Sequence, residues 1–287
     1  MTHVVAIVPA YNSAATVGAT VTALRLVPDV LDVIVVDDGS RDRTAAVASS
    51  AGARVVELAR NRGKGGAVAA GVAASGAPEI YLLIDADLGP TAAHAGKLLG
   101  PVVASQADMT VAVFGTHDRD EAGATPRRGG FGLVKRLAAR VLRIETGTAF
   151  AEPLSGQRAV RGALLRSLEL AEGFGLEIGL TLDATMRGAV IAEVEVPFAH
   201  RPTGRDIGGF AHRARIGRHV LRAASARIGG RRLLFHLVAA AIARRPVRFD
   251  VKRALSLEAL RSSLRKFGQA PLSAVRRRWR RPRSRGG

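Results

Sequence analysis

Two aspartates, Asp85 and Asp87, stand one residue apart directly after an apolar run at residues 80–84. Such a run predicts a buried strand, and two carboxylates just beyond its end would repel each other unless a cation lies beside them. Hard divalent cations such as Mg²⁺ or Mn²⁺ take oxygen ligands and often bridge a carboxylate to substrate phosphates. The pair therefore indicates metal-assisted chemistry on a diphosphate, and a solvated Asp-x-Asp turn is the alternative.

A lysine between glycines, Lys64, opens a helical pattern at residues 63–74. Glycines let the backbone approach a ligand closely, and a helix N-terminus favours anions. The stretch is not a Walker-type phosphate loop, because no Ser or Thr follows the lysine and the upstream glycine is missing. The glycine setting favours a functional lysine over an ordinary solvated one.

Strand and helix patterns alternate along the first ninety residues at the spacing of βαβ units, which predicts a mainly parallel sheet covered on both faces. In such sheets ligands bind at the carboxyl ends of the strands. We therefore expect Asp38, residues 60–64 and residues 85–87 to face one cleft. The expected strands are 3–8, 33–36, 54–58 and 80–84, and the expected helices are 14–26, 42–51 and 63–74.

The pattern is less regular beyond residue 107. We expect strands at 108–114 and 190–196 and a mobile loop at 116–132, which is rich in Gly and Arg. Expected helices cover 133–142, 157–170 and 174–186, and the pattern from residue 210 onward is basic and helical.

Positive charge is concentrated in the last third of the chain. Residues 201–287 hold 24 of the 43 Lys and Arg with three acids (a balance of +21), whereas residues 1–200 carry a balance of −2. Such a block suits an anionic partner, whether nucleic acid, acidic lipid headgroups or a phosphorylated substrate, and a solvated arginine-rich face is the alternative. The absence of cysteine excludes disulfides and thiolate metal sites and favours the cytoplasm. We see neither a signal peptide nor a transmembrane helix.

Four stretches together resemble the donor half of family 2-type glycosyltransferases with the GT-A fold: VAIVPAYNSAATV, VIVVDDGSRDRT, NRGKGGAV and LLIDADLGP. They match in order, spacing and position at strand ends. In this family a nucleotide-diphospho-sugar lies over the carboxyl edge of the sheet. The resemblance implies that the base and ribose pocket is lined by Pro9, Ala10, Tyr11 and Asn12. It further implies that Asp38 contacts the base or ribose, Lys64 approaches the nucleotide or diphosphate, Asp85 contacts the ribose or sugar, and Asp87 binds Mg²⁺ or Mn²⁺.

The second half resembles narrower groups within this family. PLSGQRAV, at residues 153–160, is similar to the Ser-Gly-x-Arg-Ala stretch of dolichol-phosphate-mannose-synthase-like enzymes. GFGLEIGLTLDA and PFAHRPTGRD resemble glucosyl-3-phosphoglycerate synthases. These likenesses imply that Glu177 is an active-site carboxylate, catalytic with Asp85 and Asp87, and that His200 is a metal ligand. They place acceptor binding at Arg127, Arg128, Gly130, Lys135, Arg136 and Arg158.

Each of these last assignments has a structural alternative. Glu177 near a helix start could simply stabilise the helix through a favourable interaction with its dipole. His200 could be a surface histidine, and Arg158 could be a structural ion-pair partner. The stretch that matches the acceptor loop reads GGFGLVKRL, which departs from the family and leaves the acceptor open.

The sequence as a whole predicts a metal-dependent hexosyltransferase of the α/β GT-A class. The donor is UDP-glucose as first choice or GDP-mannose as second, and the acceptor bears a phosphate, as a polyprenyl phosphate or a phosphoglycerate-like molecule does. An inverting or a retaining outcome, with Glu177 as the base in the inverting case, stays open, as does the oligomeric state. A nucleic-acid-binding protein, with no specific recognition motif, and an inactive GT-A scaffold are the alternatives.

The predicted organisation has two parts. Residues 1–205 form the transferase domain, with a nucleotide-sugar half at 1–115 and an acceptor half at 116–205. Residues 206–287 form a basic helical region with a partly disordered tail, suited to an anionic membrane surface. We expect a cytoplasmic protein that works in part at the inner face of the cell membrane.

Overall fold

The computed structural model describes residues 2–114, 131–171, 173–198 and 207–235. Four predicted site residues lie outside these ranges: Arg127, Arg128, Gly130 and His200. The expected loop at 116–132 and the basic tail beyond residue 235 also fall largely outside them. The chain divides into two units, Met1–Ala241 and Ile242–Gly287, and the description below concerns the first.

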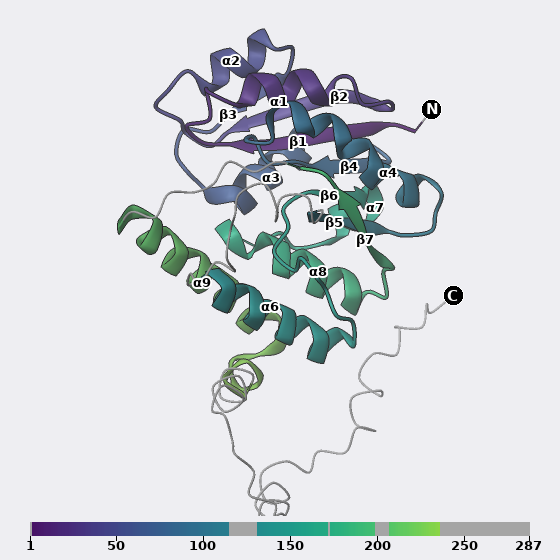
Figure 1. The fold of residues 1–287 in the computed structure, drawn as a ribbon, viewed down its shortest axis with the longest axis vertical. Helices are drawn as coiled ribbons and strands as arrows, with labels where there is room; N and C mark the ends of the chain where they lie inside the picture. The colour runs from purple at the N-terminus through teal and green to yellow at the C-terminus, as the bar shows by residue number, and fades with distance from the viewer. Residues whose placement is uncertain (1, 115–130, 172, 199–206, 236–287) are drawn as a thin grey trace, which may run out of the picture. The chain divides into compact units, whose positions relative to one another are not determined.

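Seven described strands form one sheet in the order β3-β2-β1-β4-β6-β5-β7 (Figure 1). β1, β2, β3 and β4 pair in parallel, as do β5 and β7, whereas β6 runs antiparallel to both of its neighbours. The prediction of a mainly parallel sheet is therefore confirmed. The strands are β1 (Val4–Ala10), β2 (Val30–Asp37), β3 (Arg54–Glu57), β4 (Ile80–Leu83), β5 (Met109–Phe114), β6 (Arg158–Arg161) and β7 (Ile191–Val196).

Helices cover both faces of the sheet because successive strand side chains point to opposite sides. In β1, Val4, Ala6 and Val8 enter one core, whereas Val5 and Ile7 enter another. The first core is closed by α1 (Val17–Leu24), α2 (Thr44–Ser50), the 3₁₀ helix η1 (Gly89–Ala95) and α4 (Gly96–Val103). The second is closed by α3 (Gly63–Ala74), α7 (Gly162–Ser167) and α8 (Leu176–Met186), which the 3₁₀ helix η2 (Gly173–Gly175) precedes.

A third core joins α8 to two further helices, α6 (Phe131–Thr146) and α9 (Ile207–Ile228) (Figure 1). Val220, Ala223 and Ala224 of α9 are buried there. The unit Met1–Ala241 therefore extends past residue 205, where the sequence placed the domain boundary. The apolar positions of α9 explain this extension, since a helix that buries one face against two others belongs to their core.

The prediction of a helix at residues 157–170 is wrong for its first part. Residues Arg158–Arg161 form β6, and only Gly162–Ser167 form a helix. Four residues are too few to show a period, and Ala and Arg favour a helix locally. Pairing with β4 on one side and β5 on the other satisfies the β6 backbone and overrides that preference.

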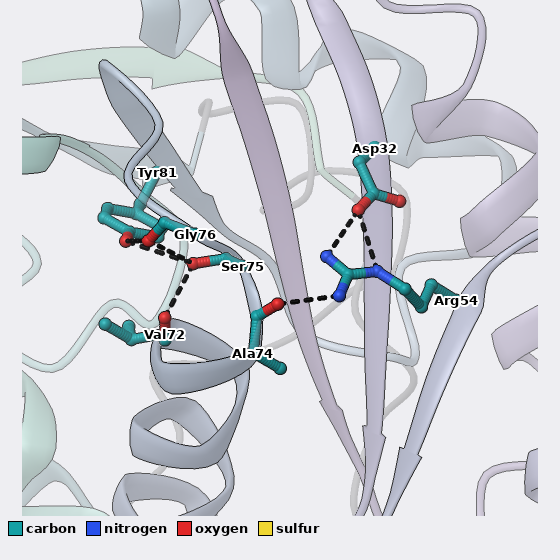
Figure 2. Close-up of polar contacts among 7 residues, drawn as sticks. All are labelled: Asp32, Arg54, Val72, Ala74, Ser75, Gly76 and Tyr81. Carbon is teal, nitrogen blue, oxygen red and sulfur yellow. Dashed lines mark hydrogen bonds and ion pairs between the residues drawn. The ribbon is translucent and has the colours of Figure 1, made fainter.

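Residues of β3 and β4 hold the C-terminal end of α3 (Figure 2). Arg54 of β3 donates to the carbonyl oxygen of Ala74 at 2.7 Å and pairs with Asp32 of β2. The hydroxyl of Ser75 lies 3.1 Å from that of the buried Tyr81 in β4. These contacts fix the axis of α3, whose first turn carries Lys64 at the opposite end of the helix.

Candidate active site

The carboxyl ends of β1 and β2 bring the first predicted donor residues together. Ala10 pairs in register with Asp37, and the amide of Asp38 donates to the carbonyl oxygen of Ala10 at 2.8 Å. Gly39 has a φ of +75°, and a Cβ there would lie 3.0 Å from the amide nitrogen of Asn61. The loop that precedes α3 therefore lies directly against the end of β2, as its order in the sequence predicts.

Asp38 is a buried carboxylate that holds this loop. It is 4% exposed, and its Oδ1 accepts a hydrogen bond from the amide of Arg62 at 2.6 Å. Burial raises the pKa of Asp38, and the backbone amides of Arg62 and Gly63 partly offset that increase. The side chain therefore fixes the loop that leads to Lys64. It also places a carboxylate at the edge of the sheet where the nucleotide is expected.

Tyr11 and Asn12 follow β1 with different surroundings. Tyr11 is 47% exposed, so its ring is accessible to a ligand such as a nucleobase. Asn12 adopts a φ of +50°, a conformation that asparagine tolerates better than most residues. Its amide nitrogen donates to Ser40 Oγ at 2.8 Å, and its Oδ1 accepts from the amide of Arg41 at 2.9 Å. Asn12 therefore joins the ends of β1 and β2, while Pro9 and Ala10 complete β1 beneath them.

Lys64, Asp85 and Glu177 form one ion cluster, which joins the two halves predicted from the sequence. Lys64 Nζ lies 2.5 Å from Asp85 Oδ1 and 2.9 Å from Glu177 Oε1. The three side chains are 16%, 27% and 7% exposed, respectively. Burial alone would lower the pKa of Lys64, but attraction to Asp85 and then to Glu177 outweighs it and raises the pKa above its usual 10.5. The cluster therefore holds a fixed cation between two carboxylates.

Gly156 leaves the space that this cluster fills. A Cβ on Gly156 would lie 2.0 Å from Lys64 Nζ and 3.1 Å from both carboxylate oxygens of Asp85. A side chain added here would force the ammonium away from its present position between the two carboxylates. This explains why a glycine stands in the Ser-Gly-Gln-Arg stretch.

We expect Gly156→Ala to lower kcat/KM for sugar transfer by about 100-fold. Displacement of the ammonium would change the positions of Asp85 and Glu177, which pair with it. The cost in folding free energy is about 1–3 kcal/mol, the range for overpacking a filled site. Steady-state kinetics and urea unfolding measure the two effects. Gly100→Ala in α4 is the matched control, since a Cβ there meets no atom within 4 Å. Wild-type kinetics for Gly156→Ala would contradict this description of the site.

A buried threonine of α1, Thr20, holds the turn that carries Asp87. Its hydroxyl donates to the carbonyl oxygen of Ala86 at 3.0 Å and accepts from the amide of Gly89 at 2.9 Å. Thr20 is fully buried. Sequence reasoning missed it, although one polar residue on the inward face of an apolar helix was the available signal.

Thr20→Val keeps the shape of the side chain and removes both hydrogen bonds to the Asp87 turn. We expect a loss of about 2 kcal/mol in the free energy of unfolding, because two buried backbone groups lose their partner. Urea denaturation measures it. The control is Thr22→Val, which should change the free energy of unfolding little. The exposed hydroxyl of Thr22 donates to the carbonyl oxygen of Gly18 in the same helix. Equal losses in the two variants would show that Thr20 does not anchor the turn.

The donor atoms at this edge fit a hard divalent cation. Both oxygens of Asp85 already engage protein donors, Lys64 on one side and Gln157 on the other, and Asp87 remains the metal ligand that the sequence predicts. Mg²⁺ and Mn²⁺ accept one or two protein carboxylates and complete their shell with substrate phosphates and water. Within the described ranges, no group of three or more His, Asp and Glu residues could hold a metal ion by itself. His200, the second predicted ligand, lies outside those ranges.

The predicted acceptor residues that the structure describes have differing environments. Lys135 pairs with Glu152 at 2.6 Å, and Arg136 is exposed on α6. Arg158 is 1% exposed and donates to the carbonyl oxygen of Ser155 and to Thr181 Oγ1, each at 2.9 Å. Burial lowers the pKa of Arg158 to about 10, despite the attraction of Glu177 and Glu193. This environment favours the structural alternative for Arg158.

Comparison with known proteins agrees with this geometry. The family model "Glycosyl transferase family 2" matches residues 5–154. Glucosyl-3-phosphoglycerate synthase of Mycobacterium tuberculosis is 34% identical over 214 residues, which cover 68% of this chain and 65% of that protein. Dolichyl-phosphate hexose transferase of Haloferax volcanii is 31% identical over 214 residues, 74% of this chain and 90% of that protein.

Solved structures give the same result. The M. tuberculosis glucosyl-3-phosphoglycerate synthase, crystallised with Mn²⁺, UDP-glucose and phosphoglyceric acid, superposes with a TM-score of 0.64 at 30% identity and covers 79% of this chain and 80% of that one. In sequence, the chain spans just under two thirds of the length of the M. tuberculosis synthase. The match to the family model and the two relatives establish that the chain belongs to glycosyl transferase family 2.

Proposed function

We propose that this protein is a metal-dependent glycosyltransferase that moves a hexose from a nucleotide-diphospho-sugar to a phosphate-bearing acceptor. UDP-glucose is the first choice of donor and GDP-mannose the second. The acceptor is a phosphoglycerate-like molecule or a polyprenyl phosphate, the two kinds named for the relatives. The observation that carries the proposal is the cluster of Lys64 between Asp85 and Glu177, at the sheet edge that also bears Asp38.

The donor half of the site supplies recognition. Tyr11 offers an exposed ring to the base, and Asp38 offers a carboxylate to the base or ribose. Asp85 contacts the ribose or the sugar, and Lys64 offsets the negative charge of Asp85 that would otherwise repel the diphosphate. These groups are held before the donor arrives, so little reorganisation accompanies binding.

Departure of a nucleotide diphosphate needs positive charge to meet the charge that develops on the leaving oxygen. A divalent ion held by Asp87, with His200 as a second ligand, would supply that charge as a Lewis acid. The chain contributes Asp87 on a turn that Thr20 fixes.

Glu177 faces the same cluster from the acceptor half. Because its carboxylate contacts Lys64 in the cluster that also holds Asp85, we propose that it lies beside the reacting sugar. A phosphate acceptor is already a competent nucleophile and needs no base, whereas a hydroxyl acceptor needs Glu177 or another group to take its proton. Arg127, Arg128, Lys135 and Arg136 remain the proposed phosphate ligands, together with the backbone at Gly130.

A direct assay tests the proposal. The full chain is incubated with UDP-glucose or GDP-mannose, Mn²⁺ or Mg²⁺, and either 3-phosphoglycerate or a polyprenyl phosphate, and release of the nucleoside diphosphate is followed. We expect metal-dependent turnover with one donor and one acceptor. Proton NMR of the anomeric position then gives the stereochemistry. If no pairing turns over and neither nucleotide binds, the protein is an inactive GT-A scaffold.

We also propose that the protein acts in the cytoplasm and binds the anionic inner face of the cell membrane through its basic C-terminal region. Exposed Leu234 and Phe235 are near Arg231 and Arg232, a combination suited to a membrane interface. The charge of residues 201–287 favours acidic headgroups. Within the part of the chain that the structure describes, no helix has the length and apolarity needed to cross a bilayer.

Co-sedimentation with vesicles tests this membrane proposal. A truncation after Ala241 leaves the first unit whole, whereas one after residue 203 would remove α9 from its core. We expect the full chain to bind vesicles with acidic headgroups more tightly than neutral vesicles, and the truncated chain to bind less. Equal binding of the full chain to acidic and neutral vesicles would contradict the proposal, and a salt-sensitive complex with random DNA would instead favour nonspecific nucleic-acid binding.

A further inference from the structure

Gln157 is a buried polar residue beside the ion cluster, and the proposed function assigns no role to its side chain. It is 1% exposed and immediately precedes β6. Because β6 runs antiparallel to β4, with Arg158 opposite Leu83, the residues just before β6 meet those just after β4. Continuing this register by one residue places Gln157 opposite Ile84, next to Asp85, and the side chains of Gln157 and Asp85 meet there.

The amide of Gln157 has a defined orientation. Its Nε2 donates to Asp85 Oδ2 at 2.6 Å, and its Oε1 accepts from Ser155 Oγ at 3.1 Å. A carboxylate only accepts hydrogen bonds, so the amide nitrogen must face Asp85. The main chain of Gln157 is also fixed, because its carbonyl oxygen accepts from the amide of Ala112 in β5 at 3.0 Å.

Asp85 is consequently held at both oxygens. Lys64 occupies Oδ1 and Gln157 occupies Oδ2, so rotation of the carboxylate breaks one charge-assisted bond or both. Ser155 acts behind Gln157 as the group that orients its amide. The three residues form a chain of hydrogen bonds that ends on the site carboxylate.

The same segment also contacts the helix that bears Glu177. Arg158 donates to Thr181 Oγ1, and that hydroxyl donates to the carbonyl oxygen of Glu177 at 3.0 Å. Gly156 provides the space for the Lys64 ammonium. Residues 155–158 thus contact Asp85 directly, leave room for Lys64, and reach the backbone of Glu177 through Thr181.

We propose that Gln157 is a positioning residue for transfer: it sets the rotamer of Asp85 against Lys64, and through Asp85 the placement of the sugar. The inference rests on the proposed function. Misplacement of a reacting group by a fraction of an ångström costs catalysis more than binding. Loss of the Gln157 amide should therefore lower kcat about 10- to 100-fold, with a change in the donor KM of less than about threefold.

The test compares three variants of the full chain. Gln157→Met keeps the length of the side chain and removes the amide. Ser155→Ala keeps Gln157 but removes the hydroxyl that orients it, so a smaller fall of about 3- to 10-fold is expected. Gln106→Met changes an exposed glutamine before β5 and is the control. Calorimetry with the donor and Mn²⁺ counts binding-competent sites, and kcat is expressed per site so that partial unfolding does not count as loss.

Normal kcat per site in both Gln157→Met and Ser155→Ala overturns the inference. A loss confined to the number of sites or to thermal stability also overturns it, because that is the signature of a merely structural role. If Gln157→Met fails to fold, Ser155→Ala decides alone. Failure of the wild-type chain and of Gln106→Met to bind or turn over any nucleotide-sugar would instead overturn the proposed function, and this inference with it.

Discussion

Replacing Lys64 with methionine is expected to lower sugar transfer by about 100- to 1,000-fold and to destabilise the fold by about 3–5 kcal/mol. The ammonium contacts Asp85 at 2.5 Å and Glu177 at 2.9 Å in a largely buried cluster. Its removal leaves two carboxylates directed at the same point with no cation between them. Methionine fills a similar volume, so the effect reports charge rather than a cavity.

Urea unfolding and steady-state kinetics measure both parts of this prediction, and Lys97→Met, at an exposed position of α4, is the control. Because the pKa of Lys64 is raised, its contribution to stability is present below 10.5 and is lost only as the pH rises through the raised value. The difference in stability between wild type and Lys64→Met should thus be constant from about pH 6 to about pH 9. A variant with wild-type stability would show that the ion pairs contribute nothing.

Replacing Asp87 with asparagine should lower turnover by at least about 100-fold at the Mn²⁺ concentration that saturates the wild type. Loss of even an outer-shell partner of a metal ligand typically costs about 10- to 100-fold. Asparagine keeps the shape of the turn and removes the charge that attracts the cation. The measurement is turnover as a function of Mn²⁺ concentration, which should require far more metal or fail to saturate.

Asp32→Asn is the control for Asp87→Asn, because Asp32 pairs with Arg54 in Figure 2 and takes no part in the site. Metal-independent binding of UDP should be alike in wild type and in Asp87→Asn. Full turnover of Asp87→Asn at ordinary Mn²⁺ would remove Asp87 from the mechanism.

The donor half of the fold was predictable because each element there carries its own signal. Apolar runs end on Asp38 and on Asp85, a glycine-flanked lysine opens α3, and these features recur at βαβ spacing. In a parallel sheet strand ends meet at one edge, so the position of a residue just after a strand already places it in space. The contact of Asp38 with the loop before Lys64 and the pairing of Lys64 with Asp85 both agree with that rule.

The acceptor half was less predictable because its contacts depend on the register between distant segments. β6 has four residues and no period, and the meeting of Gln157 with Asp85 follows only from its antiparallel pairing with β4. Arg158 was assigned to acceptor binding or to a structural ion pair, and the sequence could not show that it is buried and bonds Thr181 of α8. Glu177 came from resemblance alone, because its contact with Lys64 joins residues far apart in the chain.

Calorimetric titration of UDP-glucose into the full chain, with and without Mn²⁺, tests the central claim most directly: that a donor and a divalent ion bind together at the carboxyl ends of β1, β2 and β4. The account predicts one site per chain whose affinity rises at least about tenfold when Mn²⁺ is present, because the ion joins Asp87 to the diphosphate. Absence of binding, or an affinity that Mn²⁺ does not change, would contradict it.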